Sequence, residues 1–190
     1  GKKTVVKVAA SSTPSGEILS HLKPKLAEKG IDLQIVEMSY YIKPNLALAD
    51  KEVDANLFQH KPYLDKFVAD RGLKLTAVAN LYLAPLRVYS KKIKDLKDLP
   101  NGAIVSIPND PTNGGRALIV LEQAGVIKLR QGAGLQATPR DIVENPKNIQ
   151  IKEIEAPQLP RSLDDVSVSV INTNYAVQAG LKPTQDAIFS

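Results

Sequence analysis

The chain has 190 residues, of which 43% are hydrophobic and 24% are charged, a balance typical of a globular protein long enough for one large domain or two lobes of about 100 residues each. It has no cysteine, which excludes disulfides and thiolate chemistry, and its 2 histidines make a histidine-rich metal site unexpected. The net charge is +5, but the basic residues are dispersed, and their one dense cluster at 91–97 alternates with Asp95 and Asp98. Aromatic residues make up only 5% of the chain, too few to stack on bases, so we expect no nucleic-acid partner.

Strand-like and helix-like segments alternate through the first half of the chain. A β-branched run near the start predicts a largely buried strand. The next segment has apolar residues every four positions and predicts a helix, with a kink or an early break expected at Pro24. In chain order the predicted elements are strand 4–10, helix 13–29, strand 31–36, helix 44–51, strand 53–58, helix 61–70 and strands 75–79 and 81–89.

The second half continues the same alternation. Its predicted elements are strand 103–107, helix 111–124, helix 139–144, strands 149–154 and 166–171, and a helix that starts at 172. This order predicts an α/β fold with mainly parallel sheets and helices on both faces. The boundary between two lobes is predicted near Ala84 and Pro85, where a long apolar stretch contains a proline. Because ligands bind beyond the carboxyl ends of strands in such sheets, the segments that follow strands are the candidate sites.

The segment IPNDPTNGGR (107–116) is the most informative of these. Asp110 is placed to cap a helix, and the free N–H groups and positive dipole end of a helix start attract an anion. The glycines would let a ligand approach the backbone closely. Asn113 and Arg116 are three residues apart and share a helix face, and an arginine binds a carboxylate through two parallel hydrogen bonds. The alternative is a capped helix with Arg116 in a surface ion pair.

A second candidate segment follows the predicted strand 53–58. Phe58, His60 and Tyr63 place three rings at a strand-to-helix turn, where they could line an apolar pocket and His60 could orient a polar group. Tyr41 follows another strand and could extend the same wall. The alternatives are a structural histidine and tyrosines that pack with their hydroxyls at the surface.

The third candidate, Asn172, follows the predicted strand 166–171. It either caps the next helix or binds the ammonium or carboxylate of a ligand. Motifs of the common catalytic classes, such as G-x-S-x-G, the phosphate-binding P-loop and G-x-G-x-x-G, are missing from the sequence. We therefore expect no enzyme and no cofactor.

Six stretches together make the chain recognisable. They are VDANLFQHKPYL (53–64), YSKKIKDLKDL (89–99), IPNDPTNGGRAL (107–118), DIVENPKNI (141–149), EAPQLPRSLDD (155–165) and VINTNYA (170–176). Through them the chain resembles the NlpA/MetQ family of methionine-binding lipoproteins, which deliver substrate to an ABC importer. The stretches occur in the family's order and are distributed between residues 53 and 176.

The resemblance implies a two-lobed periplasmic-binding-protein fold (type II-like). Lobe 1 would comprise residues 1–84 and lobe 2 residues 85–176, and 177–190 would begin a return crossing to lobe 1. The first lobe would lack its C-terminal return segments, because family members continue past Phe189 with a strand whose Pro-Tyr-x-Asn motif contacts the ligand. If that segment is truly absent, we expect weak or no binding.

The resemblance also implies a function. A monomer would capture L-methionine in an inter-lobe cleft and pass it to the permease and ATPase of an ABC importer, at the periplasm or cell surface, anchored by a lipid on a cysteine that precedes this chain. D-methionine, a methionine-containing dipeptide or another small amino acid remain alternative ligands, and a surface adhesin or antigen is an alternative of another class. The implied ligand contacts are Arg116 to the carboxylate, Asn113 and Asn172 as polar partners, and Tyr41, Phe58, His60 and Tyr63 around the thioether.

Overall fold

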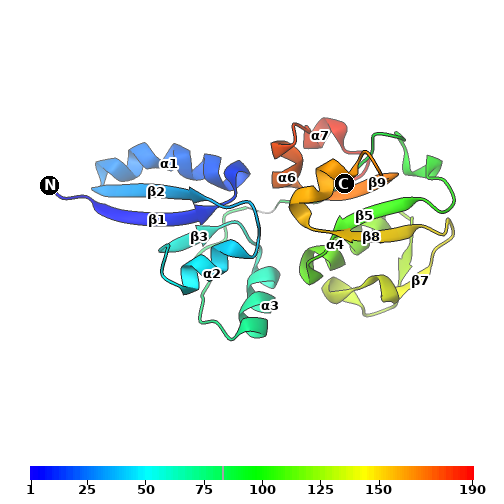
Figure 1. Cartoon of the computed structure of the whole chain (residues 1–190), viewed down its shortest axis with the longest axis horizontal. Coiled ribbons are helices and arrows are strands. Elements are labelled where there is room, and N and C mark those ends of the chain that lie inside the picture. Colours follow the sequence, from blue (N-terminus) through cyan, green and yellow to red (C-terminus); the bar gives the residue numbers. More distant parts are fainter. Residues whose placement is uncertain (83) are drawn as a thin grey trace. The chain divides into compact units, whose positions relative to one another are not determined.

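The computed structural model describes residues 1–82 and 84–190. They fall into two compact units, Gly1–Leu83 (unit 1) and Ala84–Ser190 (unit 2). Each unit is built around a sheet of mainly parallel strands with helices against it (Figure 1). The predicted α/β class with mainly parallel sheets is therefore confirmed.

Unit 1 has a 3-stranded parallel sheet in the order β2-β1-β3. Side chains alternate across the central strand, so its two faces bury different helices. Val8 and Ala10 pack in one cluster with Leu19, whereas Ala9 packs in another with Ala47. The elements are β1 (Thr4–Ala10), α1 (Glu17–Glu28), β2 (Ile31–Glu37), α2 (Lys43–Ala49), β3 (Ala55–Leu57) and α3 (Lys61–Arg71). All three strands end at the same edge, where segments 11–16, 38–42 and 58–60 follow them.

Unit 1 differs from the prediction in two places. Of the kink or early break expected at Pro24, the break does not occur, because α1 runs on to Glu28. Pro24 and Ser20 are both exposed, so solvent can hydrogen-bond the Ser20 carbonyl that has lost its N–H donor. The strand expected at 75–79 is also missing: these residues pair with no strand among those described, and Val78 is 95% exposed. Of the strand expected at 81–89 only β4 (Leu86–Tyr89) forms; Leu83 lies outside the described residues.

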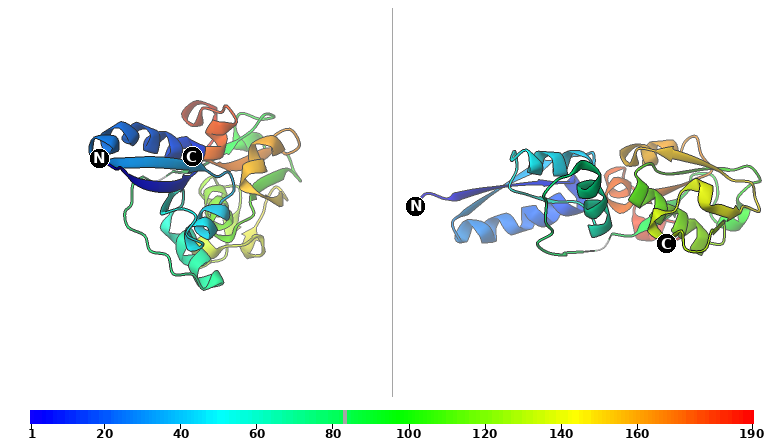
Figure 2. Two further views of the ribbon diagram at one scale, coloured as in Figure 1. Left: turned by 60° about the vertical axis from the view of Figure 1, so that its left-hand side comes forward. Right: turned by 90° about the horizontal axis from the view of Figure 1, so that it is seen from below.

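Unit 2 has a 4-stranded sheet in the order β4-β9-β5-β8. Strand β5 is parallel to both its neighbours, whereas β4 is antiparallel to β9. All five residues of β9 are buried, as expected for a continuous apolar run covered on both faces. The remaining elements of the sheet and its helices are β5 (Ile104–Pro108), α4 (Pro111–Gln123), β8 (Gln150–Ile154), α5 (Leu159–Ser162), β9 (Val168–Asn172), α6 (Thr173–Gln178) and α7 (Pro183–Asp186). Helices α4 and α5 lie on opposite faces of the sheet (Figure 2).

A small antiparallel pair accompanies this sheet, formed by β6 (Lys128–Leu129) and β7 (Ile142–Glu144). The helix predicted at 139–144 is wrong, because only the single turn Pro139–Asp141 is helical. The Asp141 carboxylate accepts the Thr138 backbone N–H at 2.8 Å and closes that turn, after which β-branched Ile142 pairs with Leu129. Other short helical turns span Ser12–Gly16, Leu96–Asp98, Gly134–Gln136 and Ala156–Gln158.

The last residues of the chain pack within unit 2. The Val88 N–H donates to the Phe189 carbonyl at 2.9 Å and the Ile188 N–H donates to the Val88 carbonyl at 2.8 Å. Residues 177–190, expected to begin a crossing to lobe 1, thus reach β4 in this structure. We assign them to unit 2.

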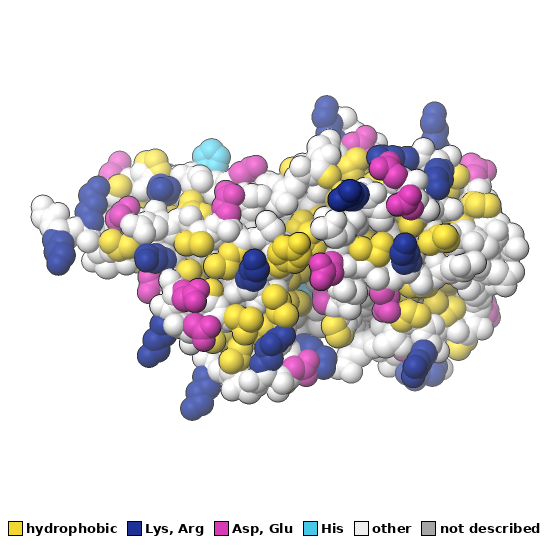
Figure 3. All heavy atoms as spheres, viewed as in Figure 1, with side chains coloured by type: hydrophobic (Ala, Val, Ile, Leu, Met, Phe, Trp, Pro, Cys, Tyr) yellow, Lys and Arg dark blue, Asp and Glu magenta, His cyan; other side chains and the backbone are white. Residues whose placement is uncertain are grey.

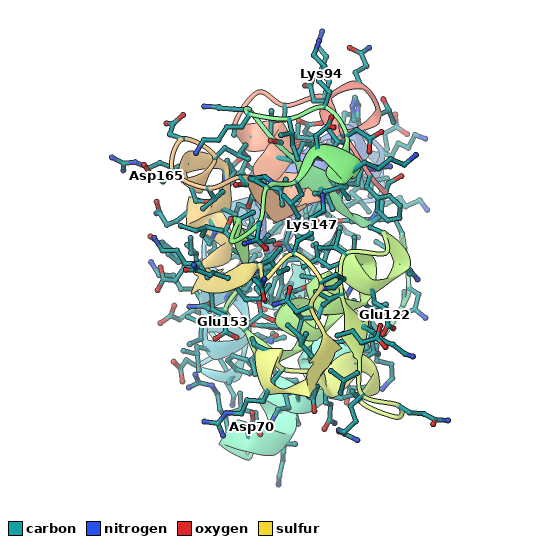
Figure 4. The ribbon with its side chains drawn as sticks, turned by 90° about the vertical axis from the view of Figure 1, so that its right-hand side faces the viewer. Asp70, Lys94, Glu122, Lys147, Glu153 and Asp165 are labelled. Carbon is teal, nitrogen blue, oxygen red and sulfur yellow. The ribbon has the colours of Figure 1, made fainter. Side chains whose placement is uncertain are left out.

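A large apolar cluster of unit 2 joins β4, β5, β9 and α4, and further buried residues, among them Leu159, Leu163 and Ile171, lie outside that cluster. Basic and acidic side chains are interspersed over the face of the molecule that Figure 3 shows. Within unit 2, the labelled side chains of Lys94 and Asp165 extend outward from the ribbon (Figure 4). Among the described residues no helix is long and apolar enough to cross a membrane.

Candidate functional site

The sheet of unit 2 brings three candidate residues to one edge. These residues, Asn113, Arg116 and Asn172, are called the polar group below. Strands β5 and β9 are parallel neighbours, so their carboxyl ends meet at the same edge. Helix α4, which contains Asn113 and Arg116, starts just beyond β5, and Asn172 is the last residue of β9.

A chain of hydrogen bonds orients Arg116. The Asp110 carboxylate caps α4 by accepting the Asn113 backbone N–H at 2.9 Å. The same carboxylate accepts the Asn113 side-chain Nδ2 at 3.0 and 3.1 Å, so the amide oxygen of Asn113 is turned the other way. That oxygen accepts Arg116 Nη1 at 3.0 Å. Asp110, which the sequence suggested only as a cap, therefore also fixes the amide that holds the guanidinium.

Two further bonds connect this edge to the start of unit 2. Arg116 Nη2 donates to the Ala84 carbonyl at 3.0 Å, and the Thr173 hydroxyl donates to the Pro85 carbonyl at 2.7 Å. Thr173 immediately follows Asn172, whose backbone pairs with Leu86, so Arg116 and Asn172 both lie near the start of unit 2. At the far end of α4, Glu122 accepts the Leu129 N–H at 2.6 Å and ties the helix to β6 (Figure 4).

Asn172 resolves one of the alternatives left open by the sequence. It stands at the residue before α6 with extended backbone, but its side chain makes no capping hydrogen bond. Its Oδ1 is buried and has no hydrogen-bond partner among the described residues. An unsatisfied buried acceptor costs about 1–3 kcal/mol, which a ligand N–H group would offset. The capping role is therefore wrong for this side chain, and its role in binding a ligand stays a prediction.

The paired glycines of α4 serve a different purpose from the one expected. A Cβ on Gly115 would lie 2.0 Å from the Leu135 carbonyl oxygen, and a Cβ on Gly114 would lie 3.0 Å from the Pro108 carbonyl oxygen. Both glycines therefore make room for backbone of the same unit, whereas the sequence suggested room for a ligand. Gly115 sets how closely α4 packs on the turn Gly134–Gln136, and Gly114 sets how closely it approaches the end of β5.

In unit 1, four rings come together as predicted from their positions after strands. Tyr41, Phe58, His60 and Tyr63 are called the ring group below. The Tyr41 ring centroid lies 5.9 Å from that of Phe58 and 6.0 Å from that of Tyr63, and Phe58 and Tyr63 are 5.9 Å apart. His60 stacks on Tyr63 at 6.4 Å. These separations are those of favourable offset and edge-to-face ring pairs.

Further residues next to the ring group were not predicted from the sequence to belong to it. Phe67 lies 5.9 Å from Tyr63, and the Arg71 guanidinium sits 4.6 Å above the Phe67 ring. Each step is four residues along α3, so helical spacing could have revealed this row. Asn45 and Gln59 were missed as well, and no spacing rule relates them.

Each group has a distinct chemistry. An arginine beside a buried amide oxygen suits a ligand with a carboxylate and an N–H donor. A cluster of rings suits an apolar or polarisable side chain.

The model of the NlpA lipoprotein family matches residues 6–190. The chain belongs to the NlpA lipoprotein family. The D-methionine-binding lipoprotein MetQ of Escherichia coli K12 is 55% identical over 162 residues, which cover 84% of this chain and 60% of that protein. The chain thus spans less than two thirds of this curated relative.

Solved structures agree with this membership. A nutrient-binding protein from Burkholderia cenocepacia, determined bound to methionine, is 48% identical with a TM-score of 0.92 over 96% of this chain and 78% of that one. An ABC-transporter periplasmic substrate-binding protein from Coxiella burnetii is 43% identical, also with a TM-score of 0.92, over 97% of this chain and 77% of its own. The predicted resemblance and the periplasmic-binding-protein fold of this NlpA-family chain are confirmed, and its relatives are ligand-binding lipoproteins, a class distinct from enzymes.

Proposed function

We propose that this chain is a substrate-binding protein that binds free methionine and delivers it to the permease and ATPase of an ABC importer, without catalysing a reaction. Methionine-binding relatives at about half identity and a transporter-associated neighbour support the assignment. In this proposal unit 1 is lobe 1 and unit 2 is lobe 2. As a member of a lipoprotein family the chain would act as a monomer at the periplasm or cell surface, held there by a lipid.

The polar group would bind the charged end of the amino acid. Arg116 would hold the carboxylate through two parallel hydrogen bonds, and its orientation is maintained by Asn113. The buried Oδ1 of Asn172 would accept a hydrogen bond from the ammonium. This unsatisfied acceptor, on the same sheet edge as an arginine, is the observation that supports an α-amino acid most directly.

The ring group would bind the side chain. A thioether is polarisable and packs favourably against ring edges, with each sulfur–ring contact contributing about 0.3–1.5 kcal/mol. Edge-to-face arrangements within the ring group present both edges and faces. Tyr41, Phe58, His60 and Tyr63 would therefore favour methionine over small or charged amino acids.

Calorimetric titration of the wild-type chain with L- and D-methionine tests this proposal. Replacing Arg116→Ala removes charged hydrogen bonds of about 1.5–3 kcal/mol each, so the Kd for methionine should rise by about 10- to 100-fold or more. Arg140→Ala is the matched control, because Arg140 is an exposed arginine of the same unit, and it should bind as the wild type does. A wild-type chain that binds neither enantiomer, or an Arg116→Ala variant that binds equally well, would contradict the proposal.

A further inference from the structure

Three side-chain amides form a closed network beneath the ring group. Asn45 Nδ2 donates to Gln59 Oε1 at 2.7 Å, and Gln59 Nε2 donates back to Asn45 Oδ1 at 2.8 Å, so the two amides pair reciprocally. Asn56 Nδ2 donates to the same Asn45 oxygen at 2.9 Å and to the Pro44 carbonyl at 3.1 Å. Gln59 Nε2 also reaches Asn56 Oδ1 at 3.2 Å.

The network includes a fully buried position, where an apolar side chain would be expected. Asn45 is fully buried within α2, although asparagine is a poor helix former and its amide is costly to bury without partners. Its oxygen and its nitrogen are both bonded. A buried polar network whose members are satisfied admits one arrangement, whereas apolar side chains of similar size would allow several.

The network joins the backbone segments from which the ring group projects. Gln59 lies between Phe58 and His60, and in extended chain alternate side chains point to opposite sides. Its amide turns toward α2, whereas Phe58 and His60 contact the rings of Tyr41 and Tyr63. Tyr41 lies two residues before α2, so the bond between Asn45 and Gln59 fixes Tyr41 relative to Phe58.

We propose that Asn45, Asn56 and Gln59 are positioning residues that set the shape of the ring group and thereby its selectivity for the ligand side chain. This inference rests on the proposed function for its binding readout. The three amides touch no ligand themselves. They act by holding α2, β3 and the segment 58–60 in one arrangement.

Gln59→Glu is the first test, because it keeps the size of the side chain but replaces the Nε2 donor with an acceptor that faces Asn45 Oδ1. The full chain is titrated with methionine, with norleucine, which lacks the sulfur, and with alanine, which lacks the side chain. Loss of one buried hydrogen bond should lower the ratio of the affinity for methionine to the affinity for alanine about tenfold. A tenfold change in affinity corresponds to about 1.4 kcal/mol, which is within the range for a single buried hydrogen bond. The affinity for alanine should stay within about twofold, since the polar group is untouched. Gln150→Glu, the same change at the exposed start of β8, is the control.

A swap of the two amides provides the rescue. Gln59→Asn shortens one partner and should lower the ratio, whereas the double variant Asn45→Gln/Gln59→Asn keeps the combined length of the pair and should restore it. The ring resonances of Phe58 and Tyr63, followed by NMR with labelled aromatic residues, report the arrangement of the ring group without any ligand. The chemical shifts of these resonances should change in Gln59→Glu and in Gln59→Asn, and they should return to the wild-type values in the double variant.

The outcomes separate this inference from the proposed function. If the wild type binds no methionine, the proposed function fails, and the ring resonances alone decide whether the amides position the rings. If Gln59→Glu does not fold, the comparison of Gln59→Asn with the double variant decides. Unchanged ring resonances and an unchanged affinity ratio in folded single variants would overturn the inference, as would a double variant that regains thermal stability but not the ratio.

Discussion

At the scale of single residues, the orientation of one amide decides how Arg116 is held. The Asp110 carboxylate accepts only, so it turns the nitrogen of the Asn113 amide toward itself and leaves the oxygen for Arg116. An acidic residue near an arginine that is proposed to bind a carboxylate would be unfavourable on charge alone. Its presence is explained by the amide that it orients and by the helix that it caps.

The Asp110→Asn variant separates these two effects by sign. Asparagine is as good a cap as aspartate, so the free energy of unfolding should change by no more than a few tenths of a kcal/mol. Coulomb's law alone predicts tighter methionine binding after the negative charge is removed. A new Nδ2 facing Asn113 instead favours a flipped amide whose nitrogen opposes Arg116, so we expect binding to weaken about tenfold, or about 1.4 kcal/mol. Calorimetric titration with methionine, together with thermal unfolding of the same variant, distinguishes the electrostatic effect from the orienting effect. Tighter methionine binding would contradict the orienting role of Asp110.

How far residues could be predicted from the sequence depended on whether a local rule applied. Arg116 and Asn113 share a helix face, and Phe58, His60 and Tyr63 flank one strand-to-helix turn, so spacing was enough to group them. Asn45 and Gln59 pair across a gap that no periodicity describes, and only the fold brings their amides together. Asn172 was ambiguous for another reason, because a capping and a ligand-binding asparagine occupy the same position in a sequence.

At the scale of elements, the position of α4 depends on a glycine that lets backbone meet backbone. A Cβ on Gly115 would lie 2.0 Å from the Leu135 oxygen and 2.8 Å from its carbonyl carbon. Neither atom belongs to a flexible side chain. The helix therefore cannot accept a larger residue there without moving away from the turn Gly134–Gln136, and Arg116 would move with it.

We expect Gly115→Ala to destabilise the protein by about 1–3 kcal/mol through overpacking, even though alanine is favoured over glycine in a helix by about 1 kcal/mol. Gly114→Ala is the graded comparison, because its Cβ would be 3.0 Å from the Pro108 oxygen and needs a smaller adjustment. Denaturant unfolding should rank Gly115→Ala below Gly114→Ala and both below the wild type. A more stable Gly115→Ala variant would show that helix propensity outweighs the contact.

The elements that could be predicted are those whose pattern matches their final surroundings. The β-branched runs of β5 and β9 are buried strands, and the capping residues Asp110 and Gly72 mark the helix ends expected. The strand expected at 4–10 forms as β1, but only its last three residues are buried, so the expectation of a largely buried strand is wrong there. The segment 75–79 has the composition of a strand but finds no partner among the described residues, and strand pairing is not a local property. The segment 139–144 divided into a turn and a strand because one side-chain bond of Asp141 closed the turn early.

At the scale of the whole molecule, the two units differ in how their apolar side chains are organised. In unit 2 a large cluster of buried apolar residues joins three strands of the sheet to α4, and further buried residues such as Leu159 and Ile171 lie outside it. In unit 1 two smaller clusters lie on opposite faces of β1. Because hydrophobic stabilisation scales with buried apolar area, global opening of unit 2 should cost more free energy than opening of unit 1.

Hydrogen exchange followed by mass spectrometry tests this difference and the proposed function in one experiment. Without ligand, amides of β5 and β9 should exchange most slowly, and amides of β1 and β2 should exchange faster. Methionine at a hundred times its Kd stabilises the bound form by about 2.7 kcal/mol, which corresponds to about hundredfold slower exchange through openings that release the ligand. If one ligand uses both the ring group and the polar group, its protection must appear in segment 58–63 of unit 1 and also around Asn113 and Asn172 in unit 2. Protection confined to one unit would mean that the two groups do not share a ligand, because a ligand slows only those openings that break its own contacts.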